Sequence, residues 1–154
     1  MTETTTDWTD TVADFVAATG ARGGLLLVFP EYRPDLAKAA AHRLGLRFFD
    51  YRAQEMSPLG TKAGSISLTS LDETLNDLAR GGGALAFNVE ALLATKEPEE
   101  RRDWIERFVR TDWPSLIVLP ITLFAEDTNA LTSRILRFQE EDLPDQGLIS
   151  RLMH

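Results

Sequence analysis

The sequence predicts an α/β fold in which a mainly parallel, five-stranded sheet lies between two layers of helices, a three-layer αβα arrangement. Segments with the residue spacing of amphipathic helices alternate with short apolar runs along the chain. The central runs are apolar at every position, which is typical of strands that are covered on both faces. Parallel neighbours also require crossover connections, and the intervening helices can supply them.

Length and composition fit one domain over residues 1–154. The chain has 154 residues, of which 44% are hydrophobic, and a domain of this size buries roughly 68–70% of its unfolded surface. It contains no cysteine and only two histidines, so we expect no disulfide, no metal site and no cofactor. The formal net charge of −8 argues against direct binding of nucleic acid through a basic surface.

The apolar runs are too short to cross a membrane. The longest, Leu25 to Pro30 and Leu116 to Phe124, fall short of the 18 or more residues of a transmembrane helix. The first ten residues are acidic and polar, unlike a signal peptide. We therefore expect a cytoplasmic protein without a membrane partner.

The elements of the first half are indicated by spacing and by the residues at their ends. Apolar residues recur every three to four positions from Trp8 to Val16, which predicts a helix within an N-terminal segment 1–19. Pro34 and Gly45 stand where a second helix would begin and end. The expected elements are a helix over 7–18, a strand over 24–29, a helix over 35–44 and a strand over 46–51.

Residues 52–69 are predicted to form a long surface loop. Pro58, Gly60 and Gly64 interrupt any helical spacing, among small polar residues. We expect at most a short strand over 65–68 within it. Loops of this length are usually functional or mobile.

The second half continues the alternation. Ser70 and Glu73 have the spacing of a capping box, and three glycines at 81–83 end the helix that follows. The expected elements after it are a strand over 84–89, a helix over 95–111, a strand over 115–124, a short helix over 127–133, a strand over 135–140 and a short helix after Pro144.

The helix over 95–111 has acidic residues in its first turn and arginines in its last, which complements the helix dipole. Three pairs lie four residues apart: Glu97–Arg101, Asp103–Arg107 and Glu106–Arg110. We expect each pair to stabilise the helix by about 0.2–0.5 kcal/mol.

Ligands of open parallel sheets bind beyond the carboxyl ends of the strands. The segments to inspect are therefore 30–36, 50–52, 88–90 and 120–128. The first of these follows the run LLLVF and precedes the helix LAKAAAHRLG.

The order of segments resembles a P-loop NTPase, specifically the core of the AAA+ ATPases without its helical lid. LLLVFPEYRPDLAKAAAHRLGLRFFD, residues 25–50, looks like that family's first strand, phosphate-binding loop, first helix and second strand. Residues 84–90 stand at the Walker B strand, and 117–122 at the sensor 1 strand, which makes Thr122 the sensor-like residue. LTSR, ending in Arg134, resembles the arginine-finger motif of clamp-loader-type members. The resemblance covers about residues 20–152.

The phosphate-binding loop departs from the Walker A pattern. That pattern needs glycines whose N–H groups wrap the phosphates, a lysine, and a hydroxyl for magnesium. This chain has no Gly, Lys, Ser or Thr there, and its two prolines lack an N–H. Its carboxylates would repel phosphate. The degenerate phosphate loop consists of Pro30, Glu31, Tyr32, Arg33, Pro34 and Asp35.

The Walker B position is altered as well. Asn88 places a neutral amide where a carboxylate would hold magnesium. Glu90 is acidic, but an offset of one residue along a strand points a side chain to the opposite face of the sheet. We therefore expect neither ATP hydrolysis nor catalytic residues.

These departures, set against the preserved order of segments, suggest a non-catalytic, AAA+-like interaction subunit of a larger ATP-dependent assembly. Proteins of this size also resemble the small P-loop-like component of bacteriophage-exclusion (BREX) defence systems. That resemblance implies protein partners among ATPase and DNA-modifying subunits, self-association, and contact with nucleic acid only through those partners. In such an assembly Arg134 would be the candidate arginine finger.

Other functions fit the same residues. An NTP-binding or NTP-hydrolysing enzyme could use Arg33, Lys62 and Glu90 as unconventional ligands. A response-regulator-like or flavodoxin-like sheet would bind another ligand, although Glu31 is the only carboxylate directly after the first strand. Arg134 could also simply be an arginine at the C-terminal end of the short helix over 127–133, where it would donate to the last carbonyl groups of that helix.

Overall fold

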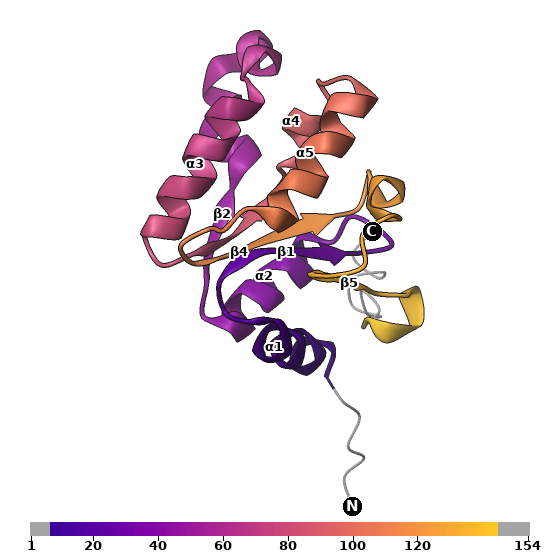
Figure 1. Ribbon diagram of the computed structural model, residues 1–154. Coiled ribbons are helices and arrows are strands. Elements are labelled where there is room, and N and C mark those ends of the chain that lie inside the picture. The colour runs from indigo at the N-terminus through magenta and orange to yellow at the C-terminus, as the bar shows by residue number, and fades with distance from the viewer. Residues whose placement is uncertain (1–6, 145–154) are drawn as a thin grey trace, which may run out of the picture.

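The computed structural model describes residues 7–144 and contains one five-stranded sheet between two layers of helices (Figure 1). Every strand pair is parallel, and the strand order is β2-β3-β4-β1-β5. The predicted α/β class is confirmed. The strands are β1 (Gly23–Val28), β2 (Arg47–Asp50), β3 (Ala84–Phe87), β4 (Leu116–Ile121) and β5 (Ile135–Arg137).

The helices are α1 (Trp8–Thr19), α2 (Pro34–Leu44), α3 (Leu68–Arg80), α4 (Glu90–Leu93) and α5 (Pro98–Arg110). Four shorter helical segments follow the ends of strands: a π-helical segment η1 (Arg52–Met56), and the 3₁₀ segments η2 (Ser57–Ser65), η3 (Ala125–Thr128) and η4 (Glu140–Asp142). None of the helices in residues 7–144 has the length and apolar character needed to traverse a lipid bilayer.

Strand β1 is an interior strand with a neighbour on each side. It pairs with β4 along its whole length, from Gly23 opposite Leu116 to Val28 opposite Ile121, and with β5 on its other side. After β1 the chain crosses to the far edge at β2, and it returns through β3 and β4 to the side of β1. Since crossovers between parallel strands are right-handed, this reversal of direction puts α2 on one face of the sheet and α3 and α5 on the other.

Two separate cores cover the two faces of the sheet. In Figure 1, α1 and α2 lie below the sheet, and α3 and α5 lie above it. Alternate residues of each strand belong to different cores: Leu26 and Val28 face α3 and α5, whereas Leu25 and Leu27 face α1 and α2. The strands β1, β3 and β4 are buried at every position, as their uniform apolar character predicted.

Most predicted elements are confirmed with ends that differ by a few residues. The predicted loop over 52–69, with its short strand over 65–68, is wrong, because the helical segments η1 and η2 and the start of α3 lie there. Met56 and Ala63 are buried and anchor this segment. A break at Gly60, whose backbone is not helical, removes the regular spacing by which the sequence could have shown it.

Three further expectations are corrected. The helix α3 begins at Leu68, with Ser67 as its N-cap accepting from the N–H of Ser70, so the predicted capping box at Ser70 does not start it. The helix expected over 127–133 is the 3₁₀ turn η3 instead. The strands expected over 115–124 and 135–140 end earlier, at Ile121 and Arg137. The helix expected after Pro144 lies outside the described residues.

The turn between α3 and β3 depends on the absence of a side chain at Gly83. Its φ is +97°, and a Cβ there would lie 2.4 Å from the carbonyl oxygen of Leu116. Gly82 has a similar φ of +108°, but nothing lies within 4 Å of a Cβ at that position. A side chain at either position would strain the backbone, but only one at Gly83 would also overlap with another strand. Comparing substitutions at the two glycines therefore distinguishes the two effects.

We expect Gly83→Ala to lower the free energy of unfolding by about 1–3 kcal/mol more than Gly82→Ala, since only the first substitution adds a steric clash to the strain of a positive φ. Urea unfolding of the two variants measures the difference. Equal losses of unfolding free energy in the two variants would mean that the backbone at Gly83 and Leu116 moves apart at no cost to admit the added Cβ.

Candidate functional site at the carboxyl edge of the sheet

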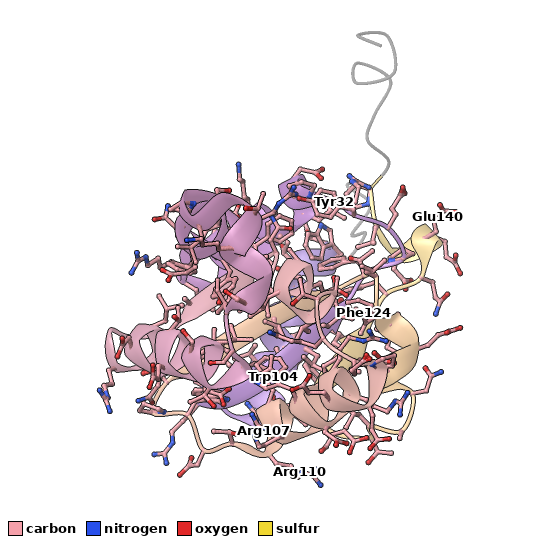
Figure 2. All side chains as sticks on the ribbon, turned by 90° about the horizontal axis from the view of Figure 1, so that it is seen from above. Tyr32, Trp104, Arg107, Arg110, Phe124 and Glu140 are labelled. Atoms are coloured by element: carbon pink, nitrogen blue, oxygen red, sulfur yellow. The ribbon has the colours of Figure 1, made fainter. Side chains whose placement is uncertain are left out.

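The reversal of chain direction places a candidate site at the carboxyl ends of β1 and β4. These strands are neighbours, and the connections that leave them run to opposite faces of the sheet. Ligands of open α/β sheets bind in the crevice at such a point. Figure 2 shows Tyr32, from the loop after β1, and Phe124, from the loop after β4, on the same side of the molecule.

The loop after β1 is closed by an ion pair of its own. Arg33 is buried, and its guanidinium donates to both carboxylate oxygens of Asp35 at 3.1 and 2.8 Å. A third bond, of 3.0 Å, goes to the carbonyl of Pro144. These hydrogen bonds from Arg33 hold the pKa of Asp35 below its usual value. The most basic group of the degenerate loop is thus held by a carboxylate two residues away.

The remaining residues of this loop offer few hydrogen-bond donors to an anion. Pro30 and Pro34 have no N–H. Glu31 is exposed, and the exposed Tyr32 packs its ring 5.4 Å from that of Phe87. An aromatic ring and a carboxylate therefore occupy the position where a phosphate cradle would be.

Asn88 turns the chain at the end of β3. It has a φ of +66°, a left-handed conformation that Asn tolerates better than most residues. Its side-chain amide donates to Oδ1 of Asp50 at 3.1 Å, and the same oxygen accepts from the N–H of Ala53. The amide of Asn88 thus links the ends of the neighbouring strands β2 and β3.

The expectation that Glu90 points to the opposite face of a strand is wrong. Strand β3 ends at Phe87, and Glu90 is the first residue of the short helix α4. The turn at Asn88 therefore decides its direction, and strand alternation does not.

Glu90 joins α4 to the loop after β4. Its carboxylate oxygens accept from the N–H groups of Thr122 at 2.9 Å and Phe124 at 2.8 Å. Burial raises the pKa of Glu90 above its usual value, although these N–H groups act in the opposite direction. The sensor-like residue Thr122 thus contacts Glu90 through its backbone.

A second ion pair fixes the same loop to α5. Nε of Arg101 lies 2.6 Å from Oδ2 of Asp127, and both side chains are largely buried. The Arg101 guanidinium also lies 3.9 Å from the centre of the Phe124 ring. Arg137, at the end of β5, donates to the hydroxyl and carbonyl oxygens of Thr128. Together with Glu90, these contacts join the segments that follow β3, β4 and β5.

Arg134 lies at the other end of β1. Its guanidinium donates to the carbonyl oxygens of Gly24 at 2.5 Å, Thr19 at 3.1 Å and Arg22 at 2.8 Å. These groups surround the amino end of the strand, whereas Glu90 lies beyond the carboxyl ends. A role as arginine finger would require Arg134 to leave all three carbonyls.

Lys62 is an exposed residue of η2. Among residues 7–144, its side chain forms no hydrogen bond with Glu90, whose oxygens accept from Thr122 and Phe124, while Arg33 is held by Asp35. Within residues 7–144, no three His, Asp or Glu side chains are placed to hold a metal ion.

Sequence reasoning missed the partners of these groups. Asp50 and Asp127 lie in the segments 50–52 and 120–128, which the rule that parallel strand ends converge marks for inspection. Their pairing with Asn88 and Arg101 was not predicted, because these partners are far away in the chain.

Comparison with known proteins assigns no family to this chain. No protein-family model matches the sequence, and no curated protein matches it either.

We expect the stability of the wild type relative to Glu90→Gln to fall as the pH rises. The buried carboxyl of Glu90 keeps its proton more tightly in the folded chain than in the unfolded one, because its pKa is raised above 4.5. This contribution is present below the usual pKa and is lost as the pH passes through the raised one. Urea unfolding across this range, with the exposed Glu97→Gln as control, measures it. If the stability of the wild type relative to Glu90→Gln instead grew with pH, the hydrogen bonds from the N–H groups would lower the pKa of Glu90 more than burial raises it.

Arg134→Ala is expected to lower the free energy of unfolding by about 2–4 kcal/mol, because three charge-assisted hydrogen bonds are lost. Arg110→Ala is the matched control. Arg110 is mostly exposed and lies 3.8 Å from Glu106, so its loss should cost less than about 1 kcal/mol. Denaturant melts compare the two. Equal stability of both variants would show that Arg134 contributes nothing to the fold and is free to act elsewhere.

Proposed function

We propose that this protein is a non-catalytic, P-loop-like interaction subunit of a larger ATP-dependent assembly. The proposal combines a parallel α/β sheet, whose order of segments resembles that of an ATPase core, with strand-end loops that lack that family's phosphate and metal ligands. It assigns the carboxyl edge of the sheet to contacts with protein rather than to nucleotide.

The layout of the sheet supports the resemblance to the AAA+ core. That family places its sensor 1 strand between the first strand and the Walker B strand. Here β4 lies between β1 and β3, and β5 lies on the other side of β1. The helix α2 follows the loop after β1 directly, as a phosphate-binding loop would require.

The observation that carries the proposal is that the polar groups at this edge already bind one another. Arg33 is paired with Asp35, Asn88 with Asp50, and Arg101 with Asp127. Glu90 is occupied by backbone N–H groups of the loop after β4. A triphosphate with magnesium would have to break these bonds and would receive no glycine-rich cradle in exchange.

The proposed partners are the ATPase and DNA-modifying subunits of a phage-exclusion (BREX) system. This assignment rests on the size of the chain and on the order of its segments. In such an assembly the protein would contact DNA only through its partners, because its net charge is −8.

Thermal melting with and without Mg-ATP tests the proposal. A ligand at a hundred times its Kd stabilises a protein by about 2.7 kcal/mol. We expect no upward shift of Tm, because the groups that would bind phosphate are already paired.

An upward shift would favour the enzyme alternative and defeat the proposal. Lys62→Ala then serves as the diagnostic variant. Loss of the shift in this variant would identify Lys62 as the phosphate ligand that the loop after β1 lacks, since the side chain is exposed.

A further inference from the structure

The carboxyl edge of the sheet carries exposed glutamates after every strand. Each of these side chains is exposed, and none forms an ion pair within residues 7–144. We call this set the acidic rim. It consists of Glu31 after β1, Glu55 after β2, Glu97, Glu99 and Glu100 after β3, Glu126 after β4, and Glu140 and Glu141 after β5.

Helix direction explains part of this arrangement. Helices α2, α3 and α5 connect parallel strands, so each begins at the carboxyl edge and ends at the amino edge. Acidic residues stabilise a first turn and arginines a last turn. Glu99 and Glu100 begin α5, and Arg107 and Arg110 end it. Figure 2 accordingly shows Arg107 and Arg110 on the side of the molecule opposite to Tyr32 and Glu140.

Most arginines at the opposite edge are paired with carboxylates. Arg22 pairs with Asp112 at 2.8 Å, Arg107 with Asp72 at 2.9 Å, and Arg80 lies 3.8 Å from Asp77. On the rim, Arg33 and Arg101 are likewise held by carboxylates. The exposed cations of that edge include Arg52, Lys62, Arg102 near the start of α5, and Arg137 at the end of β5. The glutamates of the acidic rim outnumber these cations, so the edge keeps an excess of negative charge.

Exposed apolar side chains lie on this same edge. Among residues 7–144 the large hydrophobic side chains that remain exposed are Tyr32 at 55%, Leu59 at 46% and Leu123 at 67%. Each follows the carboxyl end of a strand. Tyr32 and Leu123 follow β1 and β4, which are hydrogen-bonded neighbours. Exposed apolar side chains that follow two neighbouring strands, on an edge with unpaired glutamates, are the composition of a protein interface.

We infer that this edge, centred on Tyr32 and Leu123, docks a protein partner that presents lysine or arginine side chains around apolar ones. The negative rim attracts such a surface and repels phosphates, so it selects for a basic protein and against nucleotide or nucleic acid. A second copy of this chain would bring like charges together if the same edges met. The inference rests on the proposed function and specifies the chemistry of its partner.

The test uses the full chain and a defined probe, a synthetic peptide in which lysine and leucine alternate at helical spacing. We expect its binding, followed by NMR shifts of the ¹⁵N-labelled protein, to perturb residues 30–33 and 121–126 most. Affinity should fall with salt, since the Debye length shrinks from about 10 Å at 0.1 M to about 3 Å at 1 M. A peptide with serine in place of leucine should bind more weakly, because it cannot cover the apolar side chains.

Charge reversal on the rim supplies the decisive comparison. The double variant Glu31→Lys/Glu126→Lys, and separately Leu123→Ser, should raise the Kd at least about tenfold. The control Asp14→Lys/Glu73→Lys makes the same change of charge at exposed, unpaired acids elsewhere, on α1 and α3. The control should leave the Kd nearly unchanged. Circular dichroism verifies that all variants fold.

Equal losses in the rim variants and the control would overturn the inference, because they would show attraction by net charge alone. Dimerisation in light scattering that Leu123→Ser abolishes would also overturn it, by assigning the edge to a second copy. Failure of peptide binding leaves the Mg-ATP result untouched, so the inference and the proposed function fail separately. Stabilisation by Mg-ATP would remove the proposed function whatever the peptide does.

Discussion

The position of β1 between β4 and β5 is the constraint on which the rest of the structure depends. A strand in the middle of a parallel sheet has both edges hydrogen-bonded and both faces covered, so each of its residues must be apolar or lack a side chain. Gly24 marks the limit of this crowding, because a Cβ there would lie 2.7 Å from the carbonyl oxygen of Phe108 on α5. Polar side chains can therefore be placed only in the segments that precede and follow β1.

From that constraint the two ends of β1 take different roles. At the amino end, Arg134 gathers the carbonyl groups of three segments and joins α1, β1 and the approach to β5. At the carboxyl end, the chain leaves β1 and β4 on opposite faces, which opens the crevice that α/β proteins use for ligands. In this protein the polar groups at these strand ends are bound to one another, so the chemistry of this edge differs from that of a phosphate site.

The electrostatics of the molecule follow from the same topology. Helices that run against parallel strands bring the acidic first turns of α2 and α5 to one edge, and the basic last turns of α2, α3 and α5 to the other. Arg22 and Arg107 are paired with local carboxylates, while the glutamates of the rim keep exposed, unpaired charges. The net charge of −8 is thus unevenly distributed. This uneven distribution, rather than the total, bears on which partners the carboxyl edge can accept.

The sequence by itself determined the order of elements, their approximate ends and the fold class. Those properties depend on local patterns, such as the uniform apolar character of β1 and the residues Pro34 and Gly45 at the ends of α2. It also showed that the loop after β1 lacks glycines and a lysine. The segment η1–η2 escaped this reasoning, because a π-helix joined to a broken 3₁₀ helix has no regular hydrophobic period.

Only the tertiary structure decided which charged groups meet. Helical spacing predicted pairs of Arg101 with Glu97 and of Arg107 with Asp103, yet these arginines bind Asp127 and Asp72. A carboxylate from another element, partly shielded from water, competes successfully with an exposed neighbour one turn away, whose attraction water screens. The tertiary structure also set the direction of the Glu90 side chain. The left-handed turn at Asn88 ends β3 at Phe87, so the alternation of side chains along a strand does not extend to Glu90.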